Sequence, residues 1–294
     1  MKIWICIPVF NRIEFTLKCL ATLKTQTFQN FGVVICDHGS TDGSTQRINR
    51  DFPDVVVLNA DDSLWWTGAM NRCVEYVLQH AAEQDYLLTL NNDTELPPDY
   101  LAELAVQSTQ YPHAVLTSVV HDVATGERVS DGYRQSWLAA KDRAVSFEKH
   151  HLPGDDNVMA VTLASGRGTL FPMEVFRIVG LYDERHLPHY AADYDFSHKA
   201  QRAGFPAYVC KSCRVFSHVA ATGMTTVRDT LSLKGFITFL TSIKSPANLK
   251  TRWWYGWNNC PKALFPSYIV LDVIRLVGGY FRHFLLINAE LNKV

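Results

Sequence analysis

KIWICIPV, at residues 2–9, is the stretch that decides the fold class of this chain. Its residues are nearly all apolar, several are β-branched, and polar and apolar side chains do not alternate. A strand of this composition is buried on both faces, as in a parallel sheet that helices cover from both sides. The segment therefore predicts a first strand in the interior of an α/β domain.

Outward from this strand, helix and strand patterns alternate. A helix is expected at about residues 13–25, followed by a strand at 32–36 that ends at Asp37. The same order repeats with a strand at 55–58, a helix at about 68–82 and a strand at 86–90. This alternation predicts a parallel sheet, whose ligands bind beyond the carboxyl ends of the strands. Asn11, Asp37 and Asp93 all fall at those ends.

The sequence as far as residue 227 continues the domain less regularly. The predicted elements are a helix at 100–107, a strand at 116–120, a polar hairpin or loop at 121–156, a strand at 158–163, helices at 174–179 and 193–204, and a strand at 207–210. With 47% apolar residues over 294 positions, the chain can bury a full core. We predict one nucleotide-binding α/β domain over residues 1–227.

Residues 228–294 differ in character from the rest. They hold nine Lys or Arg and three Asp or Glu, whereas residues 1–227 hold 19 and 26. A helix is expected at about 267–288, apolar except for one polar stripe made of Asp272, Arg275, Gly279 and Arg282. The region is predicted to be a helical appendage that meets a membrane surface or a second copy in a homodimer. The alternative is an appendage whose charges simply face water.

The overall composition limits the class of protein. A formal net charge of −1 gives no indication of nucleic-acid binding. Seven cysteines without the spacing of a secreted scaffold are typical of reduced thiols in a cytoplasmic protein. The apolar start is interrupted by Pro8, so no signal peptide is expected, and no apolar window of 18 residues is free of charge. We therefore expect a cytoplasmic protein, with peripheral attachment to the inner face of the membrane as the option that the tail offers.

Polar residues at the strand ends indicate the chemistry. Taken singly, Asp37 could cap the following helix, and Asn91-Asn92-Asp93 could form a turn. Taken together, they meet the demands of a nucleotide-diphosphate sugar. Asp37 could accept the imide N–H of the base, and Asp93 could bind the Mg²⁺ or Mn²⁺ that neutralises the diphosphate.

The motifs, in their order along the chain, resemble those of the inverting glycosyltransferases of family 2, and among them the rhamnosyltransferases. The matching segments are Ile7-Pro8-Val9-Phe10-Asn11-Arg12, Asp37 with Ser40-Thr41-Asp42-Gly43-Ser44, Leu90-Asn91-Asn92-Asp93-Thr94, Gly180-Leu181-Tyr182-Asp183-Glu184 and Ala192-Asp193-Tyr194-Asp195-Phe196. The resemblance covers about residues 1–220. It implies the GT-A fold, a Rossmann-like and mostly parallel sheet flanked by helices, here with a C-terminal helical appendage.

The resemblance also implies roles for particular residues. Those implied to contact the nucleotide are Pro8, Asn11, Asp37 and Asn92. Asp93 would hold the metal together with His218, although His218 could also be an ordinary surface histidine. Those implied to line the donor and acceptor side are Trp66, Gly166, Arg167 and Asp195. Trp66 could equally be a core residue, whereas the glycines around Arg167 would let the backbone approach a sugar closely.

Two departures from the family pattern bear on the catalytic assignment. Ala192 stands where the family has an acidic residue before the base, which leaves Asp193 and Asp195 as competing candidates. We prefer Asp193, because it aligns with the second residue of the usual Glu-Asp pair, and Asp195 more readily anchors the start of a helix. Asn91 replaces the first carboxylate of the metal motif, so the metal would have one direct carboxylate, from Asp93.

The predicted function is transfer of a sugar from a UDP- or dTDP-sugar to a hydroxyl of a glycan or lipid-linked acceptor, in surface polysaccharide synthesis. Asp193 would deprotonate the acceptor, and the metal would stabilise the leaving nucleotide. Ala192 and Asn91 motivate a different class, a non-catalytic protein that binds sugar nucleotides. A nucleotidyltransferase ranks last, because no glycine-rich triphosphate loop opens the first helix.

Overall fold

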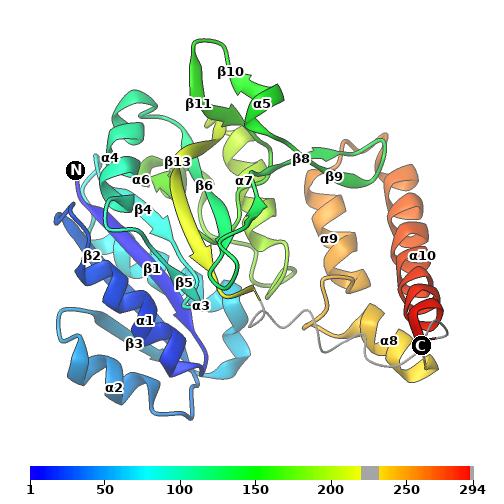
Figure 1. Cartoon of the computed structure of the whole chain (residues 1–294), viewed down its shortest axis with the longest axis horizontal. Coiled ribbons are helices and arrows are strands. Elements are labelled where there is room, and N and C mark those ends of the chain that lie inside the picture. The colour runs from blue at the N-terminus through cyan, green and yellow to red at the C-terminus, as the bar shows by residue number, and fades with distance from the viewer. Residues whose placement is uncertain (220–231, 292–294) are drawn as a thin grey trace.

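The computed structural model of the chain describes residues 1–219 and 232–291, with side chains as far as residue 282. Its centre is one mixed sheet of 11 strands within these residues, in the order β10-β11-β13-β6-β12-β4-β1-β2-β3, with β5 and β7 paired at its side. Helices cover both faces of the sheet, and three further helices stand beside it (Figure 1). The structure confirms the predicted fold class, a mostly parallel sheet flanked by helices with C-terminal helices added.

The stretch KIWICIPV forms the middle of the parallel part of the sheet. β1 (Ile3–Val9) is fully buried and lies between β2 (Phe31–His38) and β4 (Tyr86–Thr89), parallel to both, and β3 (Val56–Ala60) extends β2. Alternate side chains of β1 enter two different cores. Ile3, Ile5 and Ile7 face one core, whereas Trp4 and Cys6 face the other.

The helices divide between these two cores. On one side lie α1 (Ile13–Lys24), α2 (Ser44–Asp51) and α4 (Tyr100–Gln110). On the other lie α3 (Trp65–His80), α6 (Met173–Val179) and α7 (Ala192–Arg202). A short 3-10 helix, Asp62–Leu64, precedes α3. Both cores are therefore packed against the sheet. Loops lie at the edge where the parallel strands have their carboxyl ends.

The second half of the sheet is less regular than the sequence predicts. β12 (Thr169–Pro172) is an unpredicted strand, antiparallel to both β4 and β6 (Val115–Asp122). β13 (Ala207–Ser217) is much longer than the predicted 207–210 and pairs with β6, and β11 (Asp155–Ala160) pairs with β13. The polar stretch 121–156 contains β7 (Arg128–Ser130), a hairpin of β8 (Tyr133–Ser136) and β9 (Lys141–Ala144), α5 (Phe147–His150) and β10 (His151–Leu152). The short β5 (Thr94–Glu95) pairs with the end of β13.

The C-terminal region contains α8 (Leu233–Thr241), α9 (Leu249–Asn259) and α10 (Phe265–Leu291). These helices lie beside the sheet domain, the β8–β9 hairpin extends across one end of α9 toward α10, and α10 forms the outer edge of the molecule (Figure 1). The predicted boundary between residues 227 and 228 lies outside the described residues. In the described part of the chain, none of the helices is both long enough and apolar enough to cross a membrane.

Two residues of the polar stripe predicted on the last helix, Asp272 and Arg275, contact the rest of the molecule, whereas Gly279 and Arg282 are exposed. Asp272 is buried and forms an ion pair with Arg252 of α9, in which Arg252 Nε donates to Asp272 Oδ2 over 2.7 Å. Arg275 donates to the carbonyl oxygen of Ala140, at the turn of the β8–β9 hairpin. Asp272 and Arg275 therefore attach α10 to the rest of the molecule, and apolar residues remain on its outer face.

All seven cysteines are free thiols with buried side chains. Six of them lie in the sheet or its covering helices, and Cys260 lies between α9 and α10. The pair at close spacing, Cys210 and Cys213, is buried in the core on the α1 side of the sheet.

Candidate active site

Asn11 joins the loops that follow β1 and β2. Its backbone has a φ of +56°, in the left-handed region, which asparagine tolerates better than most residues. Its N–H donates to Ser40 Oγ over 2.7 Å, and its Oδ1 accepts from the backbone N–H of Thr41 over 2.9 Å. Pro8, by contrast, is buried within β1 beside Cys36 of β2. Asn11 thus fixes the corner of the sheet where a nucleotide is expected.

Asp37, at the end of β2, is buried in the same corner. Its Oδ1 accepts from the N–H of Ser40 over 2.9 Å, and its Oδ2 accepts from the Thr45 hydroxyl over 2.6 Å. The Thr45 hydroxyl also lies 3.0 Å from Asn59 Oδ1, at the end of β3. A carboxylate can accept about four hydrogen bonds, so Asp37 both organises its turn and keeps capacity for a further donor.

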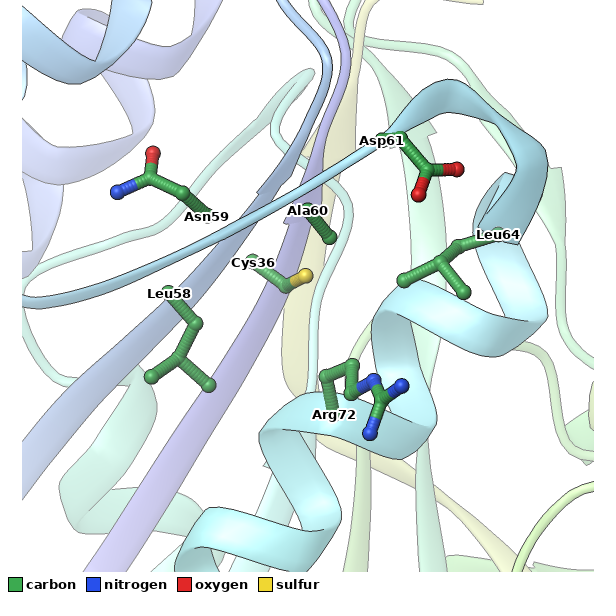
Figure 2. Close-up of a pocket in the computed structure, with 7 residues that line it drawn as sticks. All are labelled: Cys36, Leu58, Asn59, Ala60, Asp61, Leu64 and Arg72. Atoms are coloured by element: carbon green, nitrogen blue, oxygen red, sulfur yellow. The ribbon is translucent and has the colours of Figure 1, made fainter.

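A pocket of about 410 Å³ lies beside this corner, between β2, β3 and the start of α3. Leu64 and Arg72 line it on the helix side, and Cys36, Leu58 and Ala60 lie on the strand side (Figure 2). Asn59 and Asp61 complete the lining. The sequence motifs did not point to Arg72 or Asp61, because neither directly follows one of the predicted strands.

Asp93, the predicted metal ligand, lies just after β4 and is 4% exposed. Its Oδ1 is buried and has no hydrogen-bond partner among the described residues. Burial raises the pKa of the Asp93 carboxyl above its usual value, and the positive charges of Arg167 and Arg12 partly oppose this rise. A buried carboxylate oxygen without a partner fits a cation, because it is costly to leave unpaired.

His218, the other predicted metal residue, lies next to Asp93 in the fold. Its backbone N–H donates to the carbonyl oxygen of Asp93 over 3.0 Å, but its ring Nε2 lies 2.7 Å from Glu95 Oε1. Metal-bound histidines commonly give their second ring nitrogen to a carboxylate. Glu95, which the sequence did not single out, would therefore orient the ring and leave Nδ1 available.

These residues fit a hard divalent cation that takes most of its ligands from a bound molecule and from water. Within the described ranges, no three His, Cys, Asp or Glu side chains lie close enough together to form a complete metal site. A hard cation such as Mg²⁺ is often held by one or two carboxylates, with phosphate and water completing its coordination. The donor set around Asp93 fits this pattern. It leaves most of the ligands to a bound diphosphate.

Asp193, the predicted base, is held at the start of α7 by two backbone donors. Its Oδ2 accepts from the N–H of Gly166 and its Oδ1 from the N–H of Tyr194, each over 2.9 Å. Burial raises the pKa of the Asp193 carboxyl above its usual value, and these N–H groups and the charge of Arg167 partly oppose the rise. The arrangement gives a fixed carboxylate that binds a proton more readily than a surface aspartate does.

Trp66 contacts both the segment that binds Asp193 and the segment that contains Asp93. Its indole N–H donates to Asn91 Oδ1 over 3.0 Å, and its ring fills the space next to Gly166. A Cβ at position 166 would lie 2.5 Å from a ring carbon of Trp66. Gly168, likewise, has Tyr100 and Val215 where a side chain would stand. These glycines therefore make room for protein side chains, and their position beside a sugar stays a prediction.

The positive charge of Arg167 influences both carboxylates of the site. Its charge acts on both Asp93 and Asp193, and its guanidinium donates to Ser217 Oγ over 3.4 Å. Asn92, predicted at the nucleotide, instead donates through its side chain to Thr16 Oγ1 on α1 over 3.0 Å. The structure therefore brings Asp93, Asp193, Arg167 and Trp66 together, and it places Asn92 against α1.

Asp195 does not lie at the site, contrary to the expectation that it lines the donor and acceptor side. It has no exposed surface and pairs with Lys199 over 2.8 Å. It also accepts from the side-chain amides of Asn258 (3.1 Å) and Asn259 (2.7 Å) on α9. Asn258 additionally donates to Asp183 over 3.1 Å. Asp195 thus attaches α9 to the helix that carries Asp193.

Two histidines that the sequence did not single out lie near the same edge of the sheet. His38 follows Asp37 and stacks on the exposed ring of Phe10 at 5.1 Å, and His189 lies 5.6 Å from Trp65. Burial lowers the pKa of His189 to about 4 and also lowers the pKa of His38. Both rings are therefore neutral at pH 7, and in each the Nδ1 has no partner among the described residues.

Comparison with known families decides the class of this site. The profile described as Glycosyl transferase family 2 matches residues 4–165, and the profile described as Glycosyl transferase family group 2 matches residues 86–289. The chain belongs to glycosyl transferase family 2. Membership makes it a glycosyltransferase enzyme, and the catalytic class predicted from the strand-end motifs is confirmed.

Two similar proteins come from bacteria. An N-acetylglucosaminyl-diphospho-decaprenol L-rhamnosyltransferase of Mycobacterium tuberculosis is 24% identical over 220 residues, which are 68% of this chain and 71% of that protein. The glycosyltransferase GlyA of Streptococcus pneumoniae is 25% identical over 113 residues, 37% of this chain and 15% of that protein.

Solved structures share the fold of this family 2 glycosyltransferase. S. aureus TarS 1–349 superposes with a TM-score of 0.57 at 13% identity, over 93% of this chain and 71% of that one. GalNAc-T7, solved with UDP, GalNAc and Mn²⁺, gives a TM-score of 0.59 at 14% identity, over 74% of this chain and 43% of that one. At these identities the likeness concerns the fold alone.

Proposed function

We propose that this glycosyltransferase moves a sugar, with inversion at the anomeric carbon, from a UDP- or dTDP-sugar to a hydroxyl of a lipid-linked glycan. One observation carries the proposal. Trp66 packs against Gly166, whose N–H binds Asp193, and its indole N–H binds Asn91, two residues before Asp93. The carboxylate suited to a diphosphate-bound cation and the carboxylate suited to a base therefore belong to one site. The family assignment and the similarity to a rhamnosyltransferase support the same reaction.

The nucleotide would occupy the corner that Asn11 and Asp37 organise. Asp37 is buried and has capacity for the imide N–H of a uracil or thymine base. Asp93, with His218 oriented by Glu95, would hold Mg²⁺ or Mn²⁺. Such a cation supplies charge neutralisation for the departing nucleoside diphosphate.

Asp193 would act as the general base. It accepts the proton of the acceptor hydroxyl as the hydroxyl oxygen forms a bond to the anomeric carbon from the side opposite the diphosphate. The bond from the anomeric carbon to the diphosphate oxygen breaks, and the electron pair leaves with the nucleoside diphosphate. The N–H groups of Gly166 and Tyr194 keep the carboxylate in one orientation during this transfer.

The class of acceptor and the cellular location are proposed from the similar proteins and from the C-terminal helices. The mycobacterial relative is named for an acceptor linked through diphosphate to decaprenol. We extend this class of acceptor to the present chain, as a step of surface polysaccharide synthesis at the inner face of a membrane. A homodimer built on the same helices is the competing arrangement.

A panel of nucleotide sugars tests the proposal. Purified protein with Mn²⁺ would be given dTDP-L-rhamnose, UDP-N-acetylglucosamine, UDP-glucose or UDP-galactose, together with a polyprenyl-diphosphate N-acetylglucosamine acceptor. We expect acceptor-dependent release of nucleoside diphosphate with one donor, stimulation by the metal, and a product whose anomeric configuration is opposite to that of the donor. Retention of configuration, or transfer only to a non-lipid acceptor, would contradict the corresponding part of the proposal.

A further inference from the structure

The outer face of α10 is apolar and uncovered. Val270, Ile274 and Phe281 recur at spacings of four and seven residues, which places them on one side of the helix. Their exposed fractions are 57, 61 and 48%. Large apolar side chains usually lie inside a soluble domain, and several of them exposed on one helical face mark an interaction surface. We call the side chains of Val270, Ile274 and Phe281 the outer face.

Exposed aromatic side chains also lie where α9 meets the start of α10. Trp253 and Trp257 of α9 are both exposed, lie parallel at 6.5 Å, and each meets the ring of Phe265 edge-on. The Lys262 ammonium lies 3.9 Å from the centre of the Trp257 ring. Tryptophan next to lysine is typical of the boundary between hydrocarbon and water, where the ring and the charge meet different surroundings.

The exposed charges of the C-terminal helices have a single sign. Residues 232–282 contain seven Lys or Arg and only one acid, Asp272. Asp272 is buried and paired with Arg252, so it does not contribute to the surface. The six remaining cations are exposed and are Lys234, Lys244, Lys250, Lys262, Arg275 and Arg282. An apolar face on a group of helices whose exposed charges are all positive is complementary to an anionic lipid surface.

We infer that the outer face of α10 binds the surface of an anionic lipid bilayer, with the helix lying in the interface. In a symmetric dimer the same face would meet its own copy, which would bring two groups of positively charged helices together. Like charges brought together oppose such a contact, whereas anionic headgroups neutralise the same cations. The inference deepens the proposed function by naming the surface that would bring the enzyme to a lipid-linked acceptor.

Vesicle co-sedimentation of the full chain tests this inference without any sugar donor. The probes are vesicles of phosphatidylcholine alone and of phosphatidylcholine mixed with phosphatidylglycerol, each at low and at high salt. We expect binding to the anionic vesicles that weakens at least about tenfold in high salt or without phosphatidylglycerol. Equal binding to both kinds of vesicle, or to neither, would overturn the inference.

A matched pair of substitutions tests whether vesicle binding requires the outer face in particular or any exposed apolar side chain. Ile274→Glu places a charge on the face, whereas Val106→Glu does so on α4, at a side chain that is also 61% exposed. We expect Ile274→Glu to weaken vesicle binding about tenfold or more and Val106→Glu to leave it unchanged. Equal effects of the two changes would refute the assignment. Val270→Glu is the second variant if Ile274→Glu alters the circular dichroism spectrum.

Sedimentation velocity without vesicles tests whether a second copy of the chain covers the outer face. The inference expects a monomer, or an oligomer that Ile274→Glu leaves intact. A dimer that Ile274→Glu dissociates would show that a second copy covers the outer face, and it would overturn the lipid assignment. None of these measurements involves sugar transfer, so failure here would leave the proposed reaction standing, and failure of the transfer assay would leave vesicle binding standing.

Discussion

Asp193 is the residue on which the proposed chemistry depends most directly. Two backbone N–H groups bind its two carboxylate oxygens, so asparagine keeps the size of the side chain and one of these bonds but loses the ability to accept a proton. We predict that Asp193→Asn lowers kcat by roughly 10²–10⁴, with the KM for the donor changed by no more than a few fold. Steady-state kinetics with the preferred donor measures both values.

Asp195→Asn is the control for this prediction, because Asp195 lies two residues further along the same helix. Its carboxylate is buried against Lys199, Asn258 and Asn259, so its replacement should reduce the free energy of unfolding. Loss of turnover with unchanged stability in Asp195→Asn would show that Asp195, and not Asp193, is the base.

The raised pKa of Asp193 gives a prediction for pH dependence. A base works in its ionised form, so activity falls as the pH drops through its pKa. Because burial raises that pKa, the midpoint of the acid limb of kcat/KM should lie above about 3.9, the value of an unperturbed aspartate. Arg167→Gln removes a positive charge that opposes the rise, so the limb should move to still higher pH. An acid limb that stays in place in Arg167→Gln would contradict the coupling.

Asp93 should decide the metal dependence of nucleotide binding. Its unpaired, buried Oδ1 is the protein oxygen best placed for a cation, and the alanine variant lacks it. We predict that Asp93→Ala loses the increase in UDP or dTDP affinity that Mn²⁺ produces, as measured by calorimetric titration with and without the metal. Asp156→Ala is the control, since that side chain is 91% exposed on β11. Undiminished stimulation by Mn²⁺ in Asp93→Ala would remove Asp93 from the metal site.

At the scale of helices and strands, α9 is joined to the helix that carries the proposed base. Asn258 bridges Asp183, in the loop before α7, and Asp195 within α7. Hydrogen bonds to charged groups contribute about 1.5–3 kcal/mol each, so Asn258→Ala should lower the free energy of unfolding by about 2 kcal/mol or more. We also predict a lower kcat with little change in donor KM, because α7 positions Asp193.

Arg202→Ala provides the comparison for Asn258→Ala. Arg202 also connects α7 to α9, by an exposed hydrogen bond to Asn259, but it contacts neither Asp183 nor Asp195. Urea unfolding should show a loss of no more than about 0.5 kcal/mol, as for most surface changes. If the two variants lost equal stability and equal kcat, Asn258 would have no special role in positioning α7.

The parallel half of the sheet was predictable, whereas the antiparallel half was not. Strands such as β1 and β4 are apolar runs that the local sequence indicates by itself. β12 is a four-residue strand that ends in Pro172, and its pairing with β4 spans 80 residues of chain. Short strands of this kind owe their existence to tertiary pairing, which one sequence does not display.

The candidate site was predictable to a similar extent. Asp37 and Asp93 were found because they follow buried strands, and Asp193 because its motif matches a family. The partners that define their surroundings were not found, because they come from distant parts of the chain. His218 meets Glu95 across 123 positions, and Asp195 meets Asn258 across 63. No local pattern encodes such contacts, so the burial and second partner of each residue emerged only from the fold.

For the molecule as a whole, the C-terminal helices belong to the same folded body as the sheet domain. Tyr255 of α9 is buried in the core on the α3 side, and its hydroxyl bonds to His198 of α7 and Gln135 of β8. The predicted appendage is therefore attached through a core contact as well as through polar bonds. Its removal would expose groups that the sheet domain now buries.

Cooperative unfolding should follow from this attachment. Far-UV circular dichroism reports on all helices and strands, whereas tryptophan fluorescence is weighted toward α9, which carries Trp253, Trp254 and Trp257. We predict that urea unfolding followed by the two signals gives coincident midpoints, the usual test for a single transition. A fluorescence midpoint well below the dichroism midpoint would mean that α9 separates before the sheet unfolds.

Because every cysteine is buried, the rate at which each thiol is labelled measures local opening of the structure around it. The thiolate is the form that attacks alkylating reagents, and burial raises the pKa of Cys19 and of Cys36 to about 12 and also raises the pKa of Cys260. Each thiol is therefore protected twice, by lack of access and by lack of ionisation, for as long as its surroundings stay closed. The rate at which Cys260 is labelled reports on movement of α9 against α10, and the rate at Cys36 reports on the nucleotide corner. Mass spectrometry of the native protein can thus time the opening of two distant regions in one experiment, without an introduced probe.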